Sequence, residues 1–176
     1  MPPSPASPAI AVTGAAGAIG SLLRARLREH AGRLVLLDRA PLTAVGDHER
    51  VHTLDLTDGP AVHEALHDVD AVVHMAGIAD EAPLADLLAA NVLGTQNVLE
   101  AARRHGIGRV VLASSNRVGG FHPNGHVTTP DDPARPDGLY GVSKVAVEAL
   151  GRLYADKFGV SVVCLRIGSF EERPSN

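Results

Sequence analysis

Short apolar runs alternate along the chain with longer amphipathic stretches. The apolar runs have the length of buried strands, whereas in the amphipathic stretches apolar residues recur at helical spacing. This pattern predicts strands at residues 9–12, 34–37, 51–56, 71–74, 109–113 and 160–165. It predicts helices at residues 17–31, 60–68, 84–105 and 139–158.

The order of these elements predicts the fold class. The strands are apolar throughout rather than alternating, so we expect them to be buried on both faces. Strands that alternate with helices form an α/β fold with a parallel sheet. We therefore predict a Rossmann-type doubly wound six-stranded parallel sheet, in order 3-2-1-4-5-6 and with helices on both faces. It would occupy residues 9–176, after a disordered tail at 1–8, and the segment 116–137 would be a functional surface loop.

Composition narrows the class of protein. Aromatic residues make up only 3% of the chain, so the core is expected to be aliphatic. A net charge of −4 provides no basic surface for nucleic acid or an anionic membrane, and no apolar run is long enough to span a bilayer. The single cysteine, Cys164, suits a reducing compartment. We expect a cytoplasmic protein with neither nucleic-acid nor membrane partners.

The first strand leads into a glycine-rich loop with the features of a phosphate-binding turn. Residues 13–20 read TGAAGAIG, with glycines at G-x-x-G-x-x-G spacing. Such glycines allow a tight turn and close approach to a pyrophosphate, and the following helix directs N–H groups at the phosphates. A glycine-rich turn without a ligand is the alternative, but the flanking strand and helix favour dinucleotide binding. The expected contacts are Gly14, Ala16, Gly17, Ala18 and Ile19.

Acidic residues follow the second and third strands. Asp38 can accept hydrogen bonds from both ribose hydroxyls of NAD and would repel the 2′-phosphate of NADP. Arg39 instead favours NADP, because an Arg can pair with the 2′-phosphate. We predict NAD as the cofactor. Asp55 either accepts a hydrogen bond from the adenine amino group or is a helix-capping or loop carboxylate.

Three polar residues are candidates for catalysis. Tyr140 and Lys144 stand four apart near the start of a helix and so share one face, although the same spacing is common on exposed helix faces. A phenol is a poor base at neutral pH, and a nearby ammonium favours the phenolate form. Ser115 ends the fifth strand at the ligand-binding edge of the sheet, where it can donate a hydrogen bond to a substrate oxygen. Lys144 can also hold the nicotinamide ribose.

Together these motifs resemble the extended branch of the short-chain dehydrogenase/reductase superfamily, the NAD-dependent epimerase/dehydratase family. The matching pieces are TGAAGAIG at 13–20, DL at 55–56, HMAG at 74–77, NVLGT at 91–95, SS at 114–115 and YGVSK at 140–144. The resemblance implies that Tyr140 is the general base, that Lys144 stabilises its phenolate and that Ser115 polarises the substrate oxygen. It also implies cofactor contacts at Leu56, Ala76, Gly77, Asn91, Tyr140, Lys144 and Ile167. The alternative for Asn91 is a polar residue that kinks its helix.

A narrower resemblance is to the uronate dehydrogenases, which oxidise the anomeric hydroxyl of a hexuronate to a lactone and reduce NAD. It rests on LDRAPL at 37–42, SSNRVGGF at 114–121, RPDGLYGVSK at 135–144 and RIGS at 166–169. It implies sugar contacts at Ser115, Asn116 and Ser169, and at Ala79, which stands where a Ser is expected.

The resemblance implies an NAD-dependent oxidoreductase with a small sugar substrate, most simply a hexuronate. One alternative is a sugar-nucleotide epimerase or dehydratase, against which Asn116 and the glycines at 119–120 argue. The other is an NAD-binding module without catalysis, because the family continues into a substrate-covering segment that we expect to be largely absent from this chain. Apolar content on more than one face of helices 84–105 and 138–159 suggests a homodimer.

One further motif points to different chemistry. His63, Glu64 and His67 match the H-E-x-x-H pattern of zinc proteases. The apolar residues of the same segment are expected to pack on the sheet and leave both histidines toward solvent, with no third ligand. We therefore predict no metal site.

Overall fold

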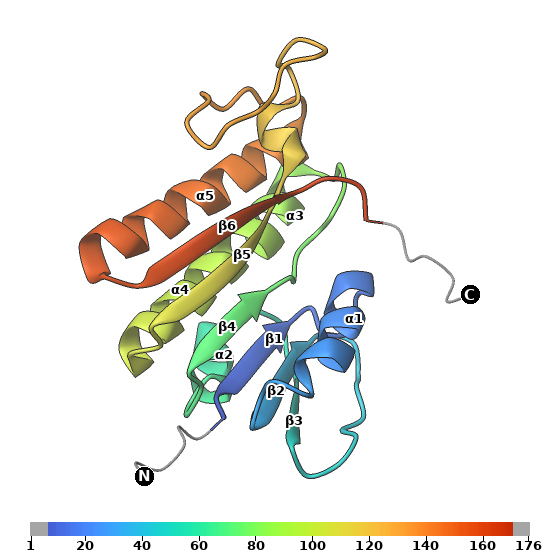
Figure 1. Cartoon of the computed structure of the whole chain (residues 1–176), viewed down its shortest axis with the longest axis vertical. Helices are drawn as coiled ribbons and strands as arrows, with labels where there is room; N and C mark the ends of the chain where they lie inside the picture. The colour runs from blue at the N-terminus through green and yellow to red at the C-terminus, as the bar shows by residue number, and fades with distance from the viewer. Residues whose placement is uncertain (1–6, 171–176) are drawn as a thin grey trace.

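The computed structural model describes residues 7–170, which form a six-stranded parallel sheet in the order β3-β2-β1-β4-β5-β6 (Figure 1). This confirms the predicted fold class and strand order. The strands are β1 (Ala9–Thr13), β2 (Arg33–Asp38), β3 (Glu49–Thr53), β4 (Ala71–His74), β5 (Arg109–Ser115) and β6 (Ser161–Ile167). The α-helices are α1 (Ala18–Leu27), α2 (Gly59–Ala65), α3 (Leu84–Leu87), α4 (Gly94–His105) and α5 (Leu139–Phe158).

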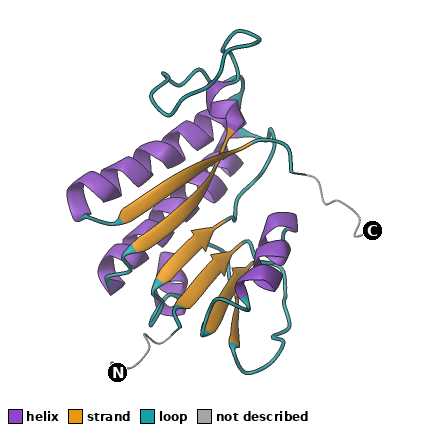
Figure 2. Ribbon diagram, viewed as in Figure 1, coloured by secondary structure: helices purple, strands orange, loops and turns teal. Residues whose placement is uncertain are grey.

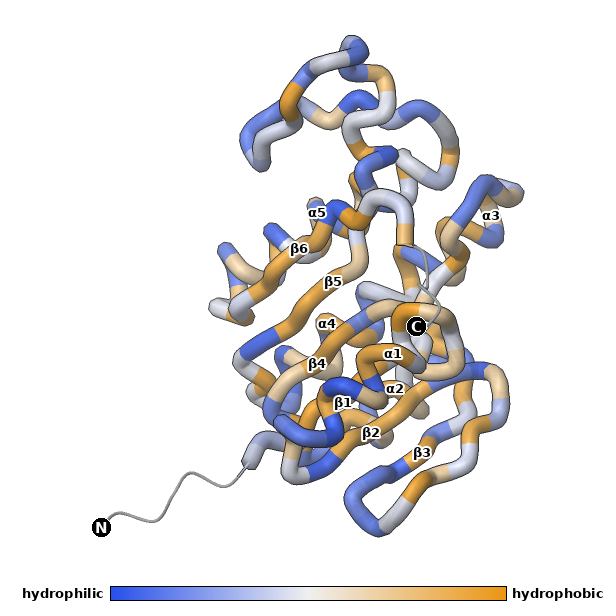
Figure 3. Tube along the Cα trace, turned by 45° about the vertical axis from the view of Figure 1, so that its right-hand side comes forward, coloured by the Kyte–Doolittle hydropathy of each residue, from blue (hydrophilic) through white to orange (hydrophobic). Residues whose placement is uncertain are grey.

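Helices cover both faces of the sheet, as predicted (Figures 1 and 2). On one face, α2, α4 and α5 enclose the larger core, in which Val35, Leu99 and Leu112 are fully buried. On the other face, α1 packs over β1 and β2 and encloses a smaller core around Val12 and Leu36. In Figure 3 apolar stretches run along strands such as β2 and β5, and the core is largely aliphatic, as expected.

The two edge strands depart from the prediction of strands buried on both faces. Exposure alternates along β6, where Val163 and Leu165 remain about half exposed because no helix of the described residues covers their face. At the opposite edge, β3 begins at Glu49 rather than at residue 51. Glu49 is buried and accepts hydrogen bonds from Arg24 and Arg28, which hold its pKa at about 2. A pattern of hydrophobic positions does not reveal an ion pair of this kind.

The predicted helix at 84–105 is continuous in space but not regular. A π-helical segment, Leu88–Leu93, separates α3 from α4 and places Asn91 on the buried side. Such π-helical insertions are frequent at functional sites. Two other helices are shorter than predicted: α1 ends at Leu27 and α2 at Ala65.

The segment 116–137 is a loop, as predicted, but it is folded on itself. It starts with a 3₁₀ turn, Asn116–Gly119. Its two arms are joined where Phe121 N donates to Arg135 O (2.9 Å) and Arg135 N donates to Val118 O (2.8 Å).

Of the predicted disordered tail at 1–8, residues 1–6 lie outside the described residues. Pro8 belongs to the ordered part, because its carbonyl accepts a hydrogen bond from Gly32 N. Residues 171–176 of the predicted domain also lie outside the described residues. Among residues 7–170, no helix combines the length and apolarity that crossing a bilayer requires.

Candidate active site

Two adjoining cavities open at the carboxyl edge of the sheet, where doubly wound folds bind ligands. The first has a volume of about 370 Å³ and lies over the ends of β1 and β2. The second, of about 620 Å³, lies between the end of β5 and the start of α5. Both are lined by Met75, Gly77 and Ile78, so the two cavities meet at the loop after β4.

The glycine-rich loop forms the floor of the first cavity. Gly14 has φ +68°, and a Cβ there would lie 2.7 Å from Ala76 N, so only glycine fits. A Cβ on Gly20 would clash with the carbonyl of Gly14, so Gly20 allows α1 to pack against the loop. No side chain among the described residues caps α1 at Gly17. The N–H groups of its first turn therefore suit an anion, and the loop fits a dinucleotide pyrophosphate.

Asp38 stands at the rim of this cavity. Its carboxylate accepts hydrogen bonds from Ala16 N and Ala40 N, each at 2.9 Å, which hold it beside the glycine loop. Arg39 and Asp55 line the same cavity. The Oδ1 atom of Asp55 accepts two hydrogen bonds from Thr57, which lower the pKa of this carboxyl. Asp55 is thus a loop carboxylate that also faces the cavity, and the cap of α2 is Asp58.

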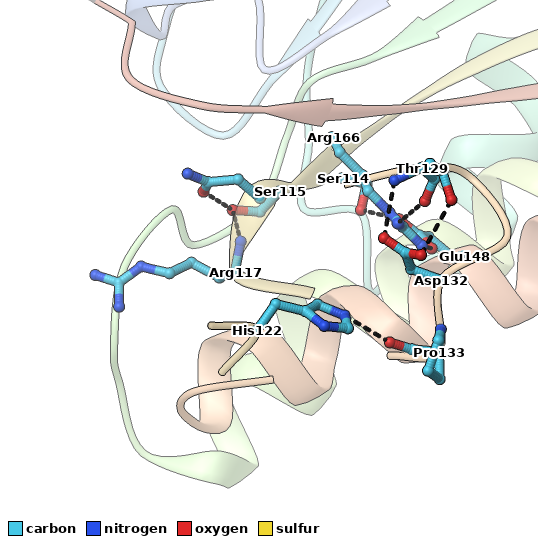
Figure 4. Close-up of polar contacts among 10 residues, drawn as sticks. Ser114, Ser115, Arg117, His122, Thr129, Asp132, Pro133, Glu148 and Arg166 are labelled. Carbon is cyan, nitrogen blue, oxygen red and sulfur yellow. Dashed lines mark hydrogen bonds and ion pairs between the residues drawn. The ribbon is translucent and has the colours of Figure 1, made fainter. Parts of the chain in front are cut away.

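The three candidate catalytic residues all line the second cavity. Lys144 is only 6% exposed, and its Nζ donates to Ala113 O (2.9 Å) and lies 5.7 Å from the centroid of the Tyr140 ring. Burial lowers the pKa of Lys144 to about 8. Ser115 Oγ accepts from Arg117 N (3.2 Å) and donates to Asn116 Oδ1 (3.3 Å), which holds the serine at the end of β5 (Figure 4).

The other predicted site residues divide between the cavities. The first cavity is lined by Gly14, Ala16, Gly17, Asp38, Arg39, Asp55, Leu56, Ala76 and Gly77. The predicted sugar contacts Ala79, Ser115, Asn116 and Ser169 line the second cavity. Ile19 and Ile167, predicted as cofactor contacts, also line the second cavity, and Ala18 lines neither.

Asn91, like Ala18, lines neither cavity. Its side chain accepts from Ile78 N (2.7 Å) and donates to Ile78 O (3.1 Å) and to Ser143 Oγ (2.9 Å). These bonds tie the π-helical segment to the loop after β4 and to α5. They agree with the alternative interpretation of Asn91 as a polar residue of a distorted helix, and the cofactor contact stays a prediction.

Several residues at the site were not among the predicted contacts. Met75 and Ile78 flank the predicted Ala76 and Gly77, and this position in the chain could have indicated that they also line the cavity. Arg117 lines the second cavity and pairs with Asp137 at 2.7 Å. Glu81 accepts from Tyr140 N (3.1 Å) at the start of α5. Nothing local in the sequence links Glu81 to a helix so far along the chain.

His74 supports the loop between the cavities from below. It is 2% exposed, with Nδ1 2.7 Å from Thr13 Oγ1 and Nε2 2.9 Å from Thr95 Oγ1. Burial lowers its pKa to about 3, so the ring is neutral near pH 7. We infer a structural role for His74, which joins β1, β4 and α4.

The H-E-x-x-H motif does not form a zinc-protease site. Because α2 ends at Ala65, His67 lies beyond the helix and the two histidines do not share a helical face. His67 is exposed, as predicted, but His63 is half-buried and stacks on the His105 ring at 4.1 Å. The Nε2 atom of His105 lies 2.8 Å from the carbonyl oxygen of His63. His105 is thus a packing residue against α2.

Replacing Lys144 with Met is expected to stabilise the fold by about 1–2 kcal/mol near pH 7. Each unit of pKa depression is worth about 1.4 kcal/mol of penalty on the buried charge, partly offset by the lost bond to Ala113 O. The gain should be largest below pH 8. It should shrink as pH rises toward 10.5, because the folded wild-type loses its proton before the unfolded chain does.

Urea unfolding of wild-type, Lys144→Met and Lys157→Met at about pH 7 and about pH 10 measures this effect. Lys157 is exposed, so its replacement is expected to change stability little at either pH. A destabilised Lys144→Met at the lower pH would contradict the burial penalty.

Comparison with known proteins identifies the family. The model of the "NAD dependent epimerase/dehydratase family" matches residues 10–171. The chain belongs to this family. The family assignment covers the glycine loop, both cavities and the Tyr140–Lys144 pair.

Within the family, the chain is similar to uronate dehydrogenases. It is 44% identical to that of Pseudomonas syringae pv. tomato, over 94% of this chain and 60% of the relative. It is 46% identical to that of Agrobacterium fabrum, over 94% of this chain and 62% of the relative. The crystal structure of uronate dehydrogenase from Agrobacterium tumefaciens matches with a TM-score of 0.90 at 45% identity, covering 96% of this chain and 64% of that one. The chain thus spans about three fifths of the length of these curated relatives.

Proposed function

We propose that this chain is the cofactor-binding and catalytic part of an NAD-dependent sugar dehydrogenase that oxidises the anomeric hydroxyl of a hexuronate to the lactone. The observation that carries the proposal is the second cavity, where Ser115, Tyr140 and Lys144 meet beside the dinucleotide cavity. The similarity to uronate dehydrogenases supports the choice of substrate class.

The first cavity would hold the adenosine and pyrophosphate of the cofactor. The glycine loop offers backbone N–H groups and close approach, and Asp38 offers two carboxylate oxygens to ribose hydroxyls. The negative charge of Asp38 favours NAD over NADP at this position. NAD, when bound, supplies a hydride acceptor beside the second cavity.

In the second cavity, one residue accepts the proton of the substrate hydroxyl and the others support this transfer. Tyr140 takes the proton of the sugar hydroxyl, while the Ser115 hydroxyl turns from Asn116 Oδ1 and donates a hydrogen bond to the same sugar oxygen. The buried Lys144 ammonium favours the phenolate of Tyr140 by its charge. With a pKa of about 8, Lys144 is mostly protonated at pH 7 and loses this effect above pH 8.

Asn116 and Ser169 offer hydrogen bonds to sugar hydroxyls from the wall of the same cavity. Ala79 provides only a small apolar surface there. These contacts are neutral and short, and Arg117, which is paired with Asp137, adds a cation to the lining of the same cavity. They suit a single sugar ring in the cavity.

We further infer a homodimer and a cytoplasmic location. Leu93, beside α4, and Val142 and Leu153 on α5 are apolar yet more than 40% exposed. Pairing of these helices with a second copy would remove that apolar surface from water. The single cysteine is consistent with a reducing compartment.

A substrate panel tests the proposed reaction. The purified chain is mixed with NAD and, in turn, with glucuronate, galacturonate, the neutral aldoses glucose and galactose, and a sugar nucleotide. The proposal predicts NADH with the two hexuronates and at least about tenfold less with the neutral sugars, which lack a carboxylate to pair with Arg117 of the second cavity. Conversion of the sugar nucleotide without net NADH would instead indicate an epimerase or dehydratase.

A further inference from the structure

Two histidines and an aspartate cluster in the loop between β5 and α5, away from both cavities. The rings of His122 and His126 stack with centroids 4.6 Å apart, and His126 Nε2 lies 2.6 Å from Asp132 Oδ2. One ligand-type atom from each of the three side chains lies within 4.8 Å of the others. Within residues 7–170, no other three His, Cys, Asp or Glu side chains are grouped this closely.

The loop already orients two of the three side chains as metal sites do. His122 Nε2 lies 3.0 Å from the carbonyl oxygen of Pro133, which can only accept (Figure 4). This contact assigns the proton to Nε2 and leaves Nδ1 as a lone-pair donor. A ligating histidine almost always has such a partner on its other nitrogen.

The carboxylate of Asp132 is held in the same way. It accepts from Thr129 N (2.9 Å) and from Thr129 Oγ1 (3.1 Å), as Figure 4 shows. An aspartate is an anion at neutral pH, and these bonds fix the direction of its carboxylate. A metal ligand must be deprotonated in this way.

The backbone of the loop brings the donors together before any ion arrives. His126 N donates to Pro123 O (3.0 Å) in a turn that contains Gly125, whose φ is +86°. The pairing of Phe121 with Arg135 closes the loop behind the cluster. The donor atoms therefore need only small shifts, in which His126 Nε2 and Asp132 Oδ2, 2.6 Å apart, separate slightly and release the proton between them. Ligands of a tetrahedral zinc ion stand about 3.3 Å apart, given bonds of about 2.0–2.1 Å.

We propose that His122, His126 and Asp132 bind one divalent transition-metal ion, with Zn²⁺ as the best match. Imidazole and carboxylate are both ligands of Zn²⁺, and water would complete the four-coordinate shell. Arg166 contacts Thr129 O of the loop at 3.4 Å and is paired with Glu148 through two bonds of 2.9 Å. Its charge is thus balanced and does not oppose a cation in the loop.

The ion would fasten the loop at the rim of the second cavity. The loop starts at Asn116, which lines that cavity, and Thr129 joins it to Arg166 on β6. Glu148 links Arg166 to Ser114, whose Oγ donates to it at 2.6 Å beside Ser115 (Figure 4). This departs from the expectation of no metal site, because the three donors approach one another only in the folded loop. The proposal does not depend on the reaction catalysed.

Calorimetric titration of the untagged, chelator-treated full chain with Zn²⁺ tests the site. We expect one ion per chain and a rise in Tm with added Zn²⁺. His126→Ala and Asp132→Asn should each weaken binding at least about tenfold, since even second-shell losses have effects of that size. His67→Ala is the matched control and should bind as the wild-type does, because its ring lies in the other histidine cluster.

Three results would overturn the proposal. They are no saturable Zn²⁺ binding by the wild-type, unchanged affinity in Asp132→Asn, and loss of binding in His67→Ala. Circular dichroism checks that each variant is folded. Asp132→Asn keeps the shape of the side chain, so it decides the question if an alanine variant fails to fold.

Discussion

Tyr140→Phe is expected to lower turnover of a hexuronate by about 10²–10⁴-fold, the usual size of a general-base contribution. The variant removes one oxygen from the second cavity and leaves the first cavity intact. NAD affinity should therefore stay within about threefold of wild-type, because a change in the second cavity has little effect on contacts in the first when the two share no partners. Steady-state kinetics and an NAD titration measure the two effects.

The matched control for this variant is Tyr154→Phe. Tyr154 lies on the same helix but is 5% exposed, and its hydroxyl donates to Glu100 rather than into either cavity. Its removal should lower stability and spare turnover. Full activity in Tyr140→Phe would show that another group takes the proton.

Asp38→Ala is expected to weaken NAD binding by about 10–100-fold. Among the residues of the first cavity, Asp38 is the one whose carboxylate is held beside the glycine loop. Each charge-assisted hydrogen bond that this carboxylate accepts contributes about 1.5–3 kcal/mol to binding. The preference for NAD over NADP should also fall, because the charge that repels a 2′-phosphate is gone. Calorimetric titration with both cofactors measures affinity and preference.

Asp47→Ala is the control for loss of one negative charge in the same region. Asp47 is exposed in the loop between β2 and β3 and lines neither cavity. Wild-type affinity in Asp38→Ala would remove Asp38 from the ribose site. Asp38→Asn, which keeps the side-chain shape, then separates the role of the charge from that of the hydrogen bonds.

The parts of the fold and site that were predictable are those encoded by neighbouring residues. The glycine loop is one continuous segment between a strand and a helix, so its spacing alone indicates the tight turn in which Gly14 has φ +68°. Tyr140 and Lys144 share a helix, and Ser115 ends a strand whose register follows from its apolar run. Parallel topology then brings these pieces to one edge of the sheet.

The parts that were not predictable depend on contacts between distant segments. The start of β3 at Glu49 rests on Arg24 and Arg28 of α1 and the turn after it, so a hydrophobicity pattern misplaces it. The role of Asn91 depends on a π-helical distortion that the amphipathic pattern of 84–105 does not reveal. Glu81 reaches the start of α5 only in the folded chain.

The central claim is that this chain holds NAD and a hexuronate in adjoining cavities and transfers hydride between them. A single-turnover experiment tests it most directly: the full chain is saturated with NAD, mixed with glucuronate, and followed by NADH fluorescence. The account predicts a burst of NADH that approaches one per chain and that is slowed by at least about 10²-fold in Tyr140→Phe. Bound NAD with no NADH formed on mixing with glucuronate or galacturonate would contradict it.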